Sequence, residues 1–106
     1  YTDHFTTDAD SEKAVEFVKA FEAEYGKLPS ISFSATGYDA ALVLLSAIQA
    51  AGTTDKEAVV AAIKATDVTA VSGKITFDDH NDPIKSAFLL TFDDQGVKKY
   101  LTQVDP

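Results

Sequence analysis

The hydrophobic period changes once along this chain of 106 residues, and the change limits the folds open to it. Up to about residue 66, apolar residues recur every three or four positions, as on the buried face of a helix. Beyond that point they alternate or run continuously, as they do in strands. Because no β-α-β repeat is present, a doubly wound parallel sheet is not expected. The pattern predicts an α+β fold in which three helices precede a three-stranded antiparallel segment with a hairpin.

Two of the expected helices carry clear boundary signals. The first has a capping residue at Asp10 or Ser11, and Gly26 suits the left-handed position that ends a helix. The second covers residues 33–51, and Gly52 follows it. It is apolar on nearly every side, which is typical of a helix in the middle of a fold.

The third helix is expected at about residues 55–65. Thr54 and Glu57 have the spacing of a capping box, in which the two side chains satisfy free N–H groups at a helix start. Its apolar stripe is narrow, as in a helix that lies on a surface.

The rest of the chain is expected to form strands. Val71–Phe77 alternates between apolar and polar residues and predicts a half-buried strand, with a turn at Asp78–Pro83. Ile84–Phe92 is almost continuously apolar, which predicts a strand covered on both faces. A turn at Asp93–Gly96 then leads into a last strand at Val97–Val104.

Charge and composition exclude several functions. The net charge of −8 would repel nucleic-acid phosphates, so nucleic-acid binding is not expected. The absence of cysteine removes disulfides, thiolate metal sites and thiol nucleophiles. The longest apolar run, Ala40–Leu45, is too short to cross a bilayer, and no leader-like pattern occurs at Tyr1.

No motif indicates catalysis. The serines have no activating base at a recognisable spacing, and the chain lacks the HExxH, GxSxG and P-loop patterns. Carboxylates are too abundant in this acidic chain to single out an acid–base pair. We therefore expect no enzyme and no cofactor.

The acidic run at residues 78–82 invites comparison with a calcium loop. An EF-hand needs glycine at the sixth position and glutamate at the twelfth, where this chain has Pro83 and Leu89. A solvated turn is the better interpretation. His4 and His80 lie far apart in the sequence and are expected at the surface, so no metal site is predicted.

Four stretches in a fixed order resemble one family: Phe17–Phe21, Tyr25–Pro29, Gly37–Ala40 and Gly73–Asp78. In that order and spacing they resemble the C-terminal part of periplasmic-type receptors for branched-chain amino acids. These receptors are the extracellular solute-binding subunits of ABC importers. The resemblance covers nearly all of the chain.

The resemblance implies a domain organisation. Receptors of this type have two α/β lobes joined by three crossings, and the chain would be a single incomplete domain of such a fold. About residues 1–70 would form a helical segment of the first lobe, and about residues 71–106 a hinge-crossing strand and a β-hairpin. The parallel strands of the lobes have no counterpart in this chain.

The resemblance also singles out Tyr38, whose counterpart lines the ligand cleft from the first lobe. Its flat ring and hydroxyl suit such a contact. The alternative is that Tyr38 packs in the core of a buried helix. Asp39 is expected to hydrogen-bond near the start of the helix or to form a salt bridge within the lobe. The family's anchors for the amino-acid ammonium and carboxylate groups have no counterpart here, so a complete site is not expected.

Two functions follow from these observations. In the first, the chain belongs to a periplasmic or extracellular receptor that captures a small amino-acid-like ligand between its lobes and delivers it to an ABC transporter permease. In the second, the chain is a small α+β interaction module, stand-alone or engineered, that self-associates as a homo-oligomer through the apolar surfaces of residues 33–51 and 84–92.

Overall fold

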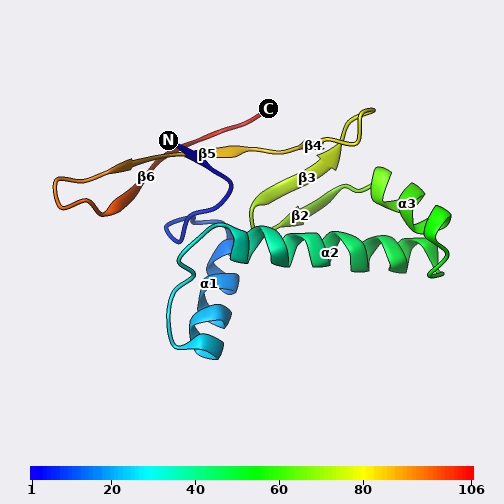
Figure 1. Ribbon diagram of the computed structural model, residues 1–106, viewed down its shortest axis with the longest axis horizontal. Coiled ribbons are helices and arrows are strands. Elements are labelled where there is room, and N and C mark those ends of the chain that lie inside the picture. The colour runs from blue at the N-terminus through cyan, green and yellow to red at the C-terminus, as the bar shows by residue number, and fades with distance from the viewer.

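The computed structural model describes residues 1–106 and has an α+β fold of three helices and six short strands (Figure 1). Helices α1 (Glu12–Tyr25), α2 (Phe33–Ala51) and α3 (Lys56–Lys64) come first, apart from one short strand at the N-terminus. The predicted fold class is therefore confirmed. None of the helices is long and apolar enough to span a membrane.

The strands form two antiparallel sheets of three strands each. The short sheet has the order β2-β3-β4 and consists of Val68–Ala70, Gly73–Phe77 and Pro83–Ile84. The long sheet has the order β1-β5-β6 and consists of Thr2–Asp3, Ala87–Phe92 and Lys98–Val104. The β5–β6 hairpin projects away from the helices, whereas the short sheet lies over α2 (Figure 1).

The predicted boundaries of the first two helices are confirmed. Ser11 caps α1, because its side chain accepts a hydrogen bond from the backbone N–H of Ala14 at 3.3 Å. Gly26 and Gly52 end α1 and α2 with φ of 67° each, the left-handed conformation that glycine adopts without a steric penalty.

The start of α3 differs from the predicted capping box at Thr54 and Glu57. The N-cap is Asp55, whose carboxylate accepts a hydrogen bond from the N–H of Ala58 at 3.0 Å. Thr53 in turn accepts from the N–H of Asp55 at 3.2 Å. Aspartate caps a helix as well as threonine does, so the local sequence contained two competing caps and the structure uses the one closer to the helix.

Two predicted strands are divided. The predicted strand Val71–Phe77 is wrong at its start, because Val71 and Ser72 form a tight turn between β2 and β3, with Ala70 paired to Gly73. The predicted strand Ile84–Phe92 is interrupted at Lys85–Ser86, where the chain passes from the short sheet to the long one. The alternation of apolar and polar residues does not reveal which neighbour a strand pairs with. The sequence pattern therefore predicted neither interruption.

The buried apolar residues gather in two clusters. The first cluster joins the long sheet to α1 and the start of α2, and contains Phe5, Ala9, Ala14, Ala35, Val71, Phe88 and Leu90. The second joins α2 to the short sheet and contains Val43, Ala70 and Ile75. Ala70, the last residue of β2, and Val71, which follows it, thus belong to different clusters.

Helix α2 is not covered on all sides, contrary to the expectation for a helix in the middle of a fold. Its buried residues form one stripe at every fourth position: Ala35, Asp39, Val43 and Ala47. Phe33, Leu44 and Leu45 are exposed. The reason is physical: the 106 residues provide partners for one face of α2 only.

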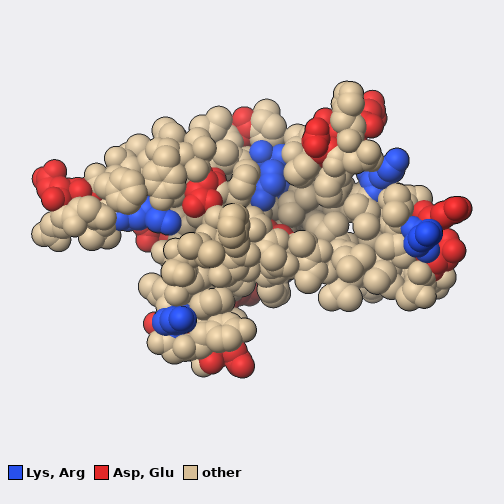
Figure 2. Space-filling model, in the orientation of Figure 1, with Lys and Arg blue, Asp and Glu red and all other residues tan.

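The molecule is flat and elongated, with extents of 51 × 32 × 18 Å. Its radius of gyration is 15.4 Å, whereas a compact domain of this length has about 13 Å. Its accessible surface is 7097 Å², against about 5,700 Å² for a folded monomer of this mass. Uncharged surface extends along α2 in Figure 2, while acidic side chains gather at the tip of the β5–β6 hairpin. The chain therefore exposes more surface than a self-contained domain does.

Replacing the α3 cap tests the local structure. Asp55→Ala leaves the N–H of Ala58 without its acceptor and should lower the free energy of unfolding by about 1 kcal/mol. Urea unfolding followed by circular dichroism measures the change. Thr54→Ala is the matched control and should not change the free energy of unfolding. A larger loss of stability for Thr54→Ala than for Asp55→Ala would instead support Thr54 as the cap.

Candidate functional site

The most constrained polar group of the protein is the carboxylate of Asp39 on α2. Asp39 is 2% exposed. It accepts hydrogen bonds from the backbone N–H groups of Val71 and Ser72, both at 2.8 Å, and from the Ser72 hydroxyl at 2.5 Å. These contacts join residues more than 30 positions apart, and they compensate the cost of removing a charge from water.

Lys85 extends this arrangement from Asp39 through Ser72 to the segment between the two sheets. Its ammonium group donates a hydrogen bond to the Ser72 hydroxyl oxygen. Burial lowers the pKa of Lys85 from its usual value, and the nearby Asp39 carboxylate opposes that shift. A half-buried ammonium group thus lies against a buried carboxylate, with one serine between them.

A serine next to a lysine of lowered pKa is also a feature of some hydrolases. Ser72 does not fit that role, because it is 0% exposed and no substrate carbonyl can reach its oxygen. Its hydroxyl donates to Asp39 and accepts from Lys85, so both functions of the group are in use. The arrangement is structural.

A hollow of about 530 Å³ lies beside Asp39, between α2 and the short sheet. Val43, Ile75 and Phe77 provide its apolar part, and Thr36 and Lys85 contribute polar groups. His4 also lines it. The hollow therefore offers both apolar packing and hydrogen bonding.

Tyr38 precedes Asp39 on α2 but lies outside that hollow. The residue is 54% exposed, and its ring centroid is 5.4 Å from that of Phe17 on α1. Tyr38 lines a smaller recess of about 150 Å³ between the two helices, together with Lys13, Glu16 and Leu42. The ring is therefore at the surface and not in the core of the helix.

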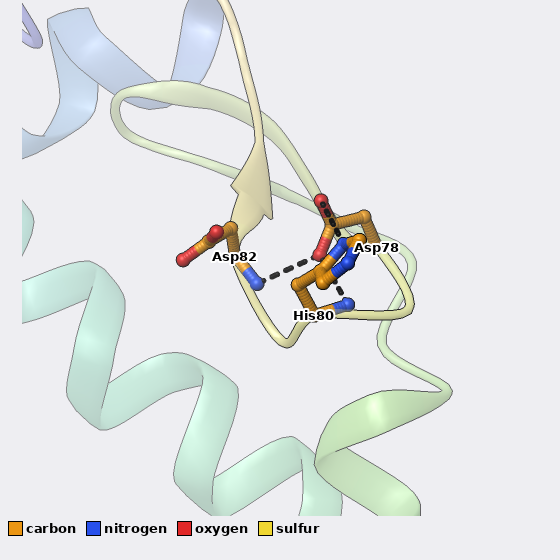
Figure 3. Close-up of polar contacts among 3 residues, drawn as sticks. All are labelled: Asp78, His80 and Asp82. Carbon is orange, nitrogen blue, oxygen red and sulfur yellow. Dashed lines mark hydrogen bonds and ion pairs between the residues drawn. The ribbon is translucent and has the colours of Figure 1, made fainter.

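The acidic run at residues 78–82 forms a turn between β3 and β4. One carboxylate oxygen of Asp78 accepts hydrogen bonds from the backbone N–H groups of His80 and Asp82, at 2.8 and 2.9 Å (Figure 3). The carboxylate of Asp82 points away from this group (Figure 3). No group of three or more His, Asp or Glu side chains has the arrangement of a metal site.

The β5–β6 turn repeats this arrangement. Asp93 accepts hydrogen bonds from the N–H groups of Gln95 and Val97 at 3.0 and 2.9 Å. The bond from Val97 is the largest of the contributions that lower the pKa of Asp93. In both turns the fourth residue, Asn81 or Gly96, has a positive φ. The first aspartate of each run therefore serves its own hairpin and not a metal ion.

The sequence pattern did not assign these roles to Asp39 and Lys85. Asp39 does not bond near the helix start, as one expectation had it, but reaches the turn between β2 and β3. A signal was present, since Asp39 lies midway between Ala35 and Val43 on the buried stripe of α2. A carboxylate in an apolar stripe must find donors from another part of the fold.

Comparison with known proteins identifies the class to which this chain belongs. Residues 1–97 match the model of the family described as periplasmic binding protein. The chain belongs to the periplasmic binding protein family. This is a family of binding proteins and not of enzymes. A search of curated protein sequences gave no significant match.

Solved structures of ABC transporter binding proteins share the fold. A leucine-binding protein from Thermotoga maritima is 34% identical, with a TM-score of 0.83 over 99% of this chain. A substrate-binding protein from Desulfitobacterium hafniense in complex with Leu is 28% identical, with a TM-score of 0.85 over 94% of this chain. A solute-binding protein from R. palustris in complex with benzoate is 25% identical, with a TM-score of 0.85 over 99%.

The chain spans about 30% of the length of these structures: 30%, 30% and 29% respectively. Their bound ligands differ in chemistry, an aliphatic amino acid in one and an aromatic acid in another. The family is therefore established for this chain, and its ligand is a separate question.

Asp39→Asn tests the central hydrogen bonds. The substitution removes the charge and turns an N–H₂ group toward backbone donors, so it should lower the free energy of unfolding by about 2 kcal/mol. Urea unfolding measures the loss. The control Asp67→Asn breaks an exposed ion pair with Lys74 and should change stability by less than about 0.5 kcal/mol. Equal effects of the two substitutions would contradict the role of Asp39.

Proposed function

We propose that this chain forms part of a receptor that captures a small amino-acid-like solute between two lobes. The observation that carries the proposal is the match of residues 1–97 to the family, together with 34% identity to a leucine-binding protein over 99% of the chain. The large exposed surface agrees with it, because a piece of a larger fold leaves the faces of its neighbours uncovered.

The proposed division of the chain assigns about residues 1–70 to the first lobe and about residues 71–106 to a hinge-crossing strand and a hairpin. The passage of the chain from one sheet to the other at Lys85–Ser86 supports a crossing within residues 71–106. The boundary at about residue 70 rests on the family resemblance alone, since β2 and β3 pair across it. In the whole receptor, ligand binding would close the lobes about such crossings.

Tyr38 is the proposed contribution of this chain to the ligand site. Tyr38 is more than half exposed, and its ring contacts the ring of Phe17 at an angle of 58°. Part of its surface is therefore free to contact a ligand. An aromatic face with a hydroxyl suits both an apolar side chain and a polar group of a ligand. The remaining contacts, above all those to the ammonium and carboxylate groups, would come from other parts of the receptor.

The proposed partners are a small-molecule ligand and the permease of an ABC importer, and the proposed location is periplasmic or extracellular. Both proposals rest on the family and on the solved ABC transporter binding proteins that share the fold. The ligand is proposed to be an amino acid because the leucine-binding protein has the highest identity of the three relatives compared above.

A chimera tests this function. The segment of the Thermotoga maritima leucine-binding protein that this chain matches is replaced by the 106 residues. We expect the chimera to bind leucine in titration calorimetry, because the two proteins share the fold of this segment. The isolated chain should bind no leucine, since it supplies one wall of the site.

Two results would contradict the proposal. High-affinity leucine binding by the isolated chain would show that the site is complete within 106 residues. A chimera that folds by circular dichroism but binds no leucine, when the unmodified Thermotoga maritima protein does, would remove the amino-acid receptor assignment.

The same chimera tests Tyr38. Tyr38→Ala removes the ring and should weaken leucine binding by about tenfold, the equivalent of one lost aromatic contact. Tyr38→Phe separates the ring from the hydroxyl. The matched control is Tyr25→Ala, an exposed aromatic residue at the end of α1, which should leave the affinity unchanged. If Tyr38→Ala lowers only the thermal stability, Tyr38 is a packing residue.

A second candidate is a self-associating interaction module. The exposed apolar side chains Phe33, Leu44 and Leu45 on α2 favour it, because a surface of this kind usually contacts a partner. A homo-oligomer of the isolated chain is compatible with both candidates. The chimera distinguishes them, since a self-associating module would not restore leucine binding to a foreign receptor.

A further inference from the structure

One extended segment connects the two sheets. Pro83–Ile84 pairs with β3 in the short sheet, and Ala87–Phe92 pairs with β1 and β6 in the long sheet. Only Lys85 and Ser86 lie between them. The direct connection between the two sheets is therefore two residues long.

Each of the two linker residues is anchored by its side chain to a different sheet. Lys85 donates a hydrogen bond to Ser72, in the turn that joins β2 to β3. Ser86 donates to the Asp105 carboxylate at 2.7 Å and accepts from the Gln103 amide at 3.0 Å, at the far end of β6. Adjacent residues thus point to opposite neighbours, as alternation along an extended chain requires.

The anchor of Lys85 is itself held by a helix. Ser72 is fully buried, and its hydroxyl donates to Asp39 while it accepts from Lys85. The two backbone N–H groups of the turn are bound to the same carboxylate. If Lys85 turned away, the buried Ser72 oxygen would lose its donor and the Asp39 carboxylate would lose a nearby positive charge. Both losses lower stability in a site removed from water.

Asp39 also lies at the boundary between the two apolar clusters. One helical turn before it, Ala35 belongs to the first cluster, and one turn after it, Val43 belongs to the second. The polar chain from Asp39 to Lys85 therefore crosses the molecule where apolar packing changes from one sheet to the other.

We infer that Asp39, Ser72 and Lys85 form a positioning device that fixes the direction in which β5 leaves the short sheet, and so sets the resting angle between the two sheets. The consequence for the receptor rests on the proposed function. If the two sheets belong to different lobes, the same hydrogen bonds bias the angle between the lobes of the receptor. The geometry itself concerns only the 106 residues.

Distance measurements on the full chain test the device. The protein has no cysteine, so Lys64→Cys on α3 and Asp94→Cys at the tip of the β5–β6 hairpin would be the only two sites to carry spin labels. Both residues are exposed, and the two elements lie at opposite ends of the molecule (Figure 1). Dilution with unlabelled protein removes distances between copies, and pulsed electron paramagnetic resonance gives the distance distribution.

Lys85→Met keeps the aliphatic stem and removes the donor, and Ser72→Ala removes the bridge. Both should shift and broaden the distribution of distances between the labels, while circular dichroism shows an unchanged helix content. The control is Lys74→Met on β3, where the lysine forms only an exposed ion pair with Asp67. It should leave the distribution unchanged.

An unchanged distribution in folded Lys85→Met would overturn the inference, whether or not Ser72→Ala remains folded. Loss of helix content in Lys85→Met would also overturn it, because Lys85 would then be required for the fold and not for the sheet angle. Leucine binding does not enter this measurement. A chimera without leucine binding thus contradicts the proposed function alone, and unchanged label distances contradict the positioning device alone.

Discussion

The hydrogen bonds of the Asp39 carboxylate are the interaction on which the arrangement of the elements depends. Three donors from the turn at Val71–Ser72 meet one buried side chain of α2. Because these donors have no other acceptor, the turn is fixed at the level of Asp39 along α2. The two apolar clusters form on either side of it. Lys85 then connects the next segment to the same group.

The second constraint is the surface that the chain does not cover. Apolar clusters of seven and three buried residues are small for 106 residues, and α2 buries one stripe while its other sides remain open. Hydrophobic burial is the main favourable term in folding. A polar chain across the boundary between two small cores therefore determines more of the geometry here than it would in a compact domain. The small amount of buried apolar surface agrees with the family comparison, because the solved relatives are more than three times as long as this chain.

The predictions from sequence were correct where the interactions join residues close together in the chain, and they failed where the interactions join distant residues. The ends of α1 and α2 at Gly26 and Gly52 were predicted correctly, because a left-handed glycine terminates a helix through contacts within a few residues. The strand expected at Val71–Phe77 was partly wrong, since its first residues are a turn bound to a helix more than 30 residues away. The site at Asp39 was missed for the same reason, and the proposed role of Tyr38 is still a prediction.

The sequence by itself determined the helices, the order of helices before strands, the two aspartate turns and the resemblance to a family of solute receptors. Each of these depends on periodicity, on local hydrogen bonding or on short motifs, all of which are present in the linear chain. Only the tertiary structure decided that the strands divide into two sheets at Lys85–Ser86, and that Asp39 and Ser72 meet. The physical reason is that a buried charge selects its donors by position in space, and the sequence does not state which distant groups will be there.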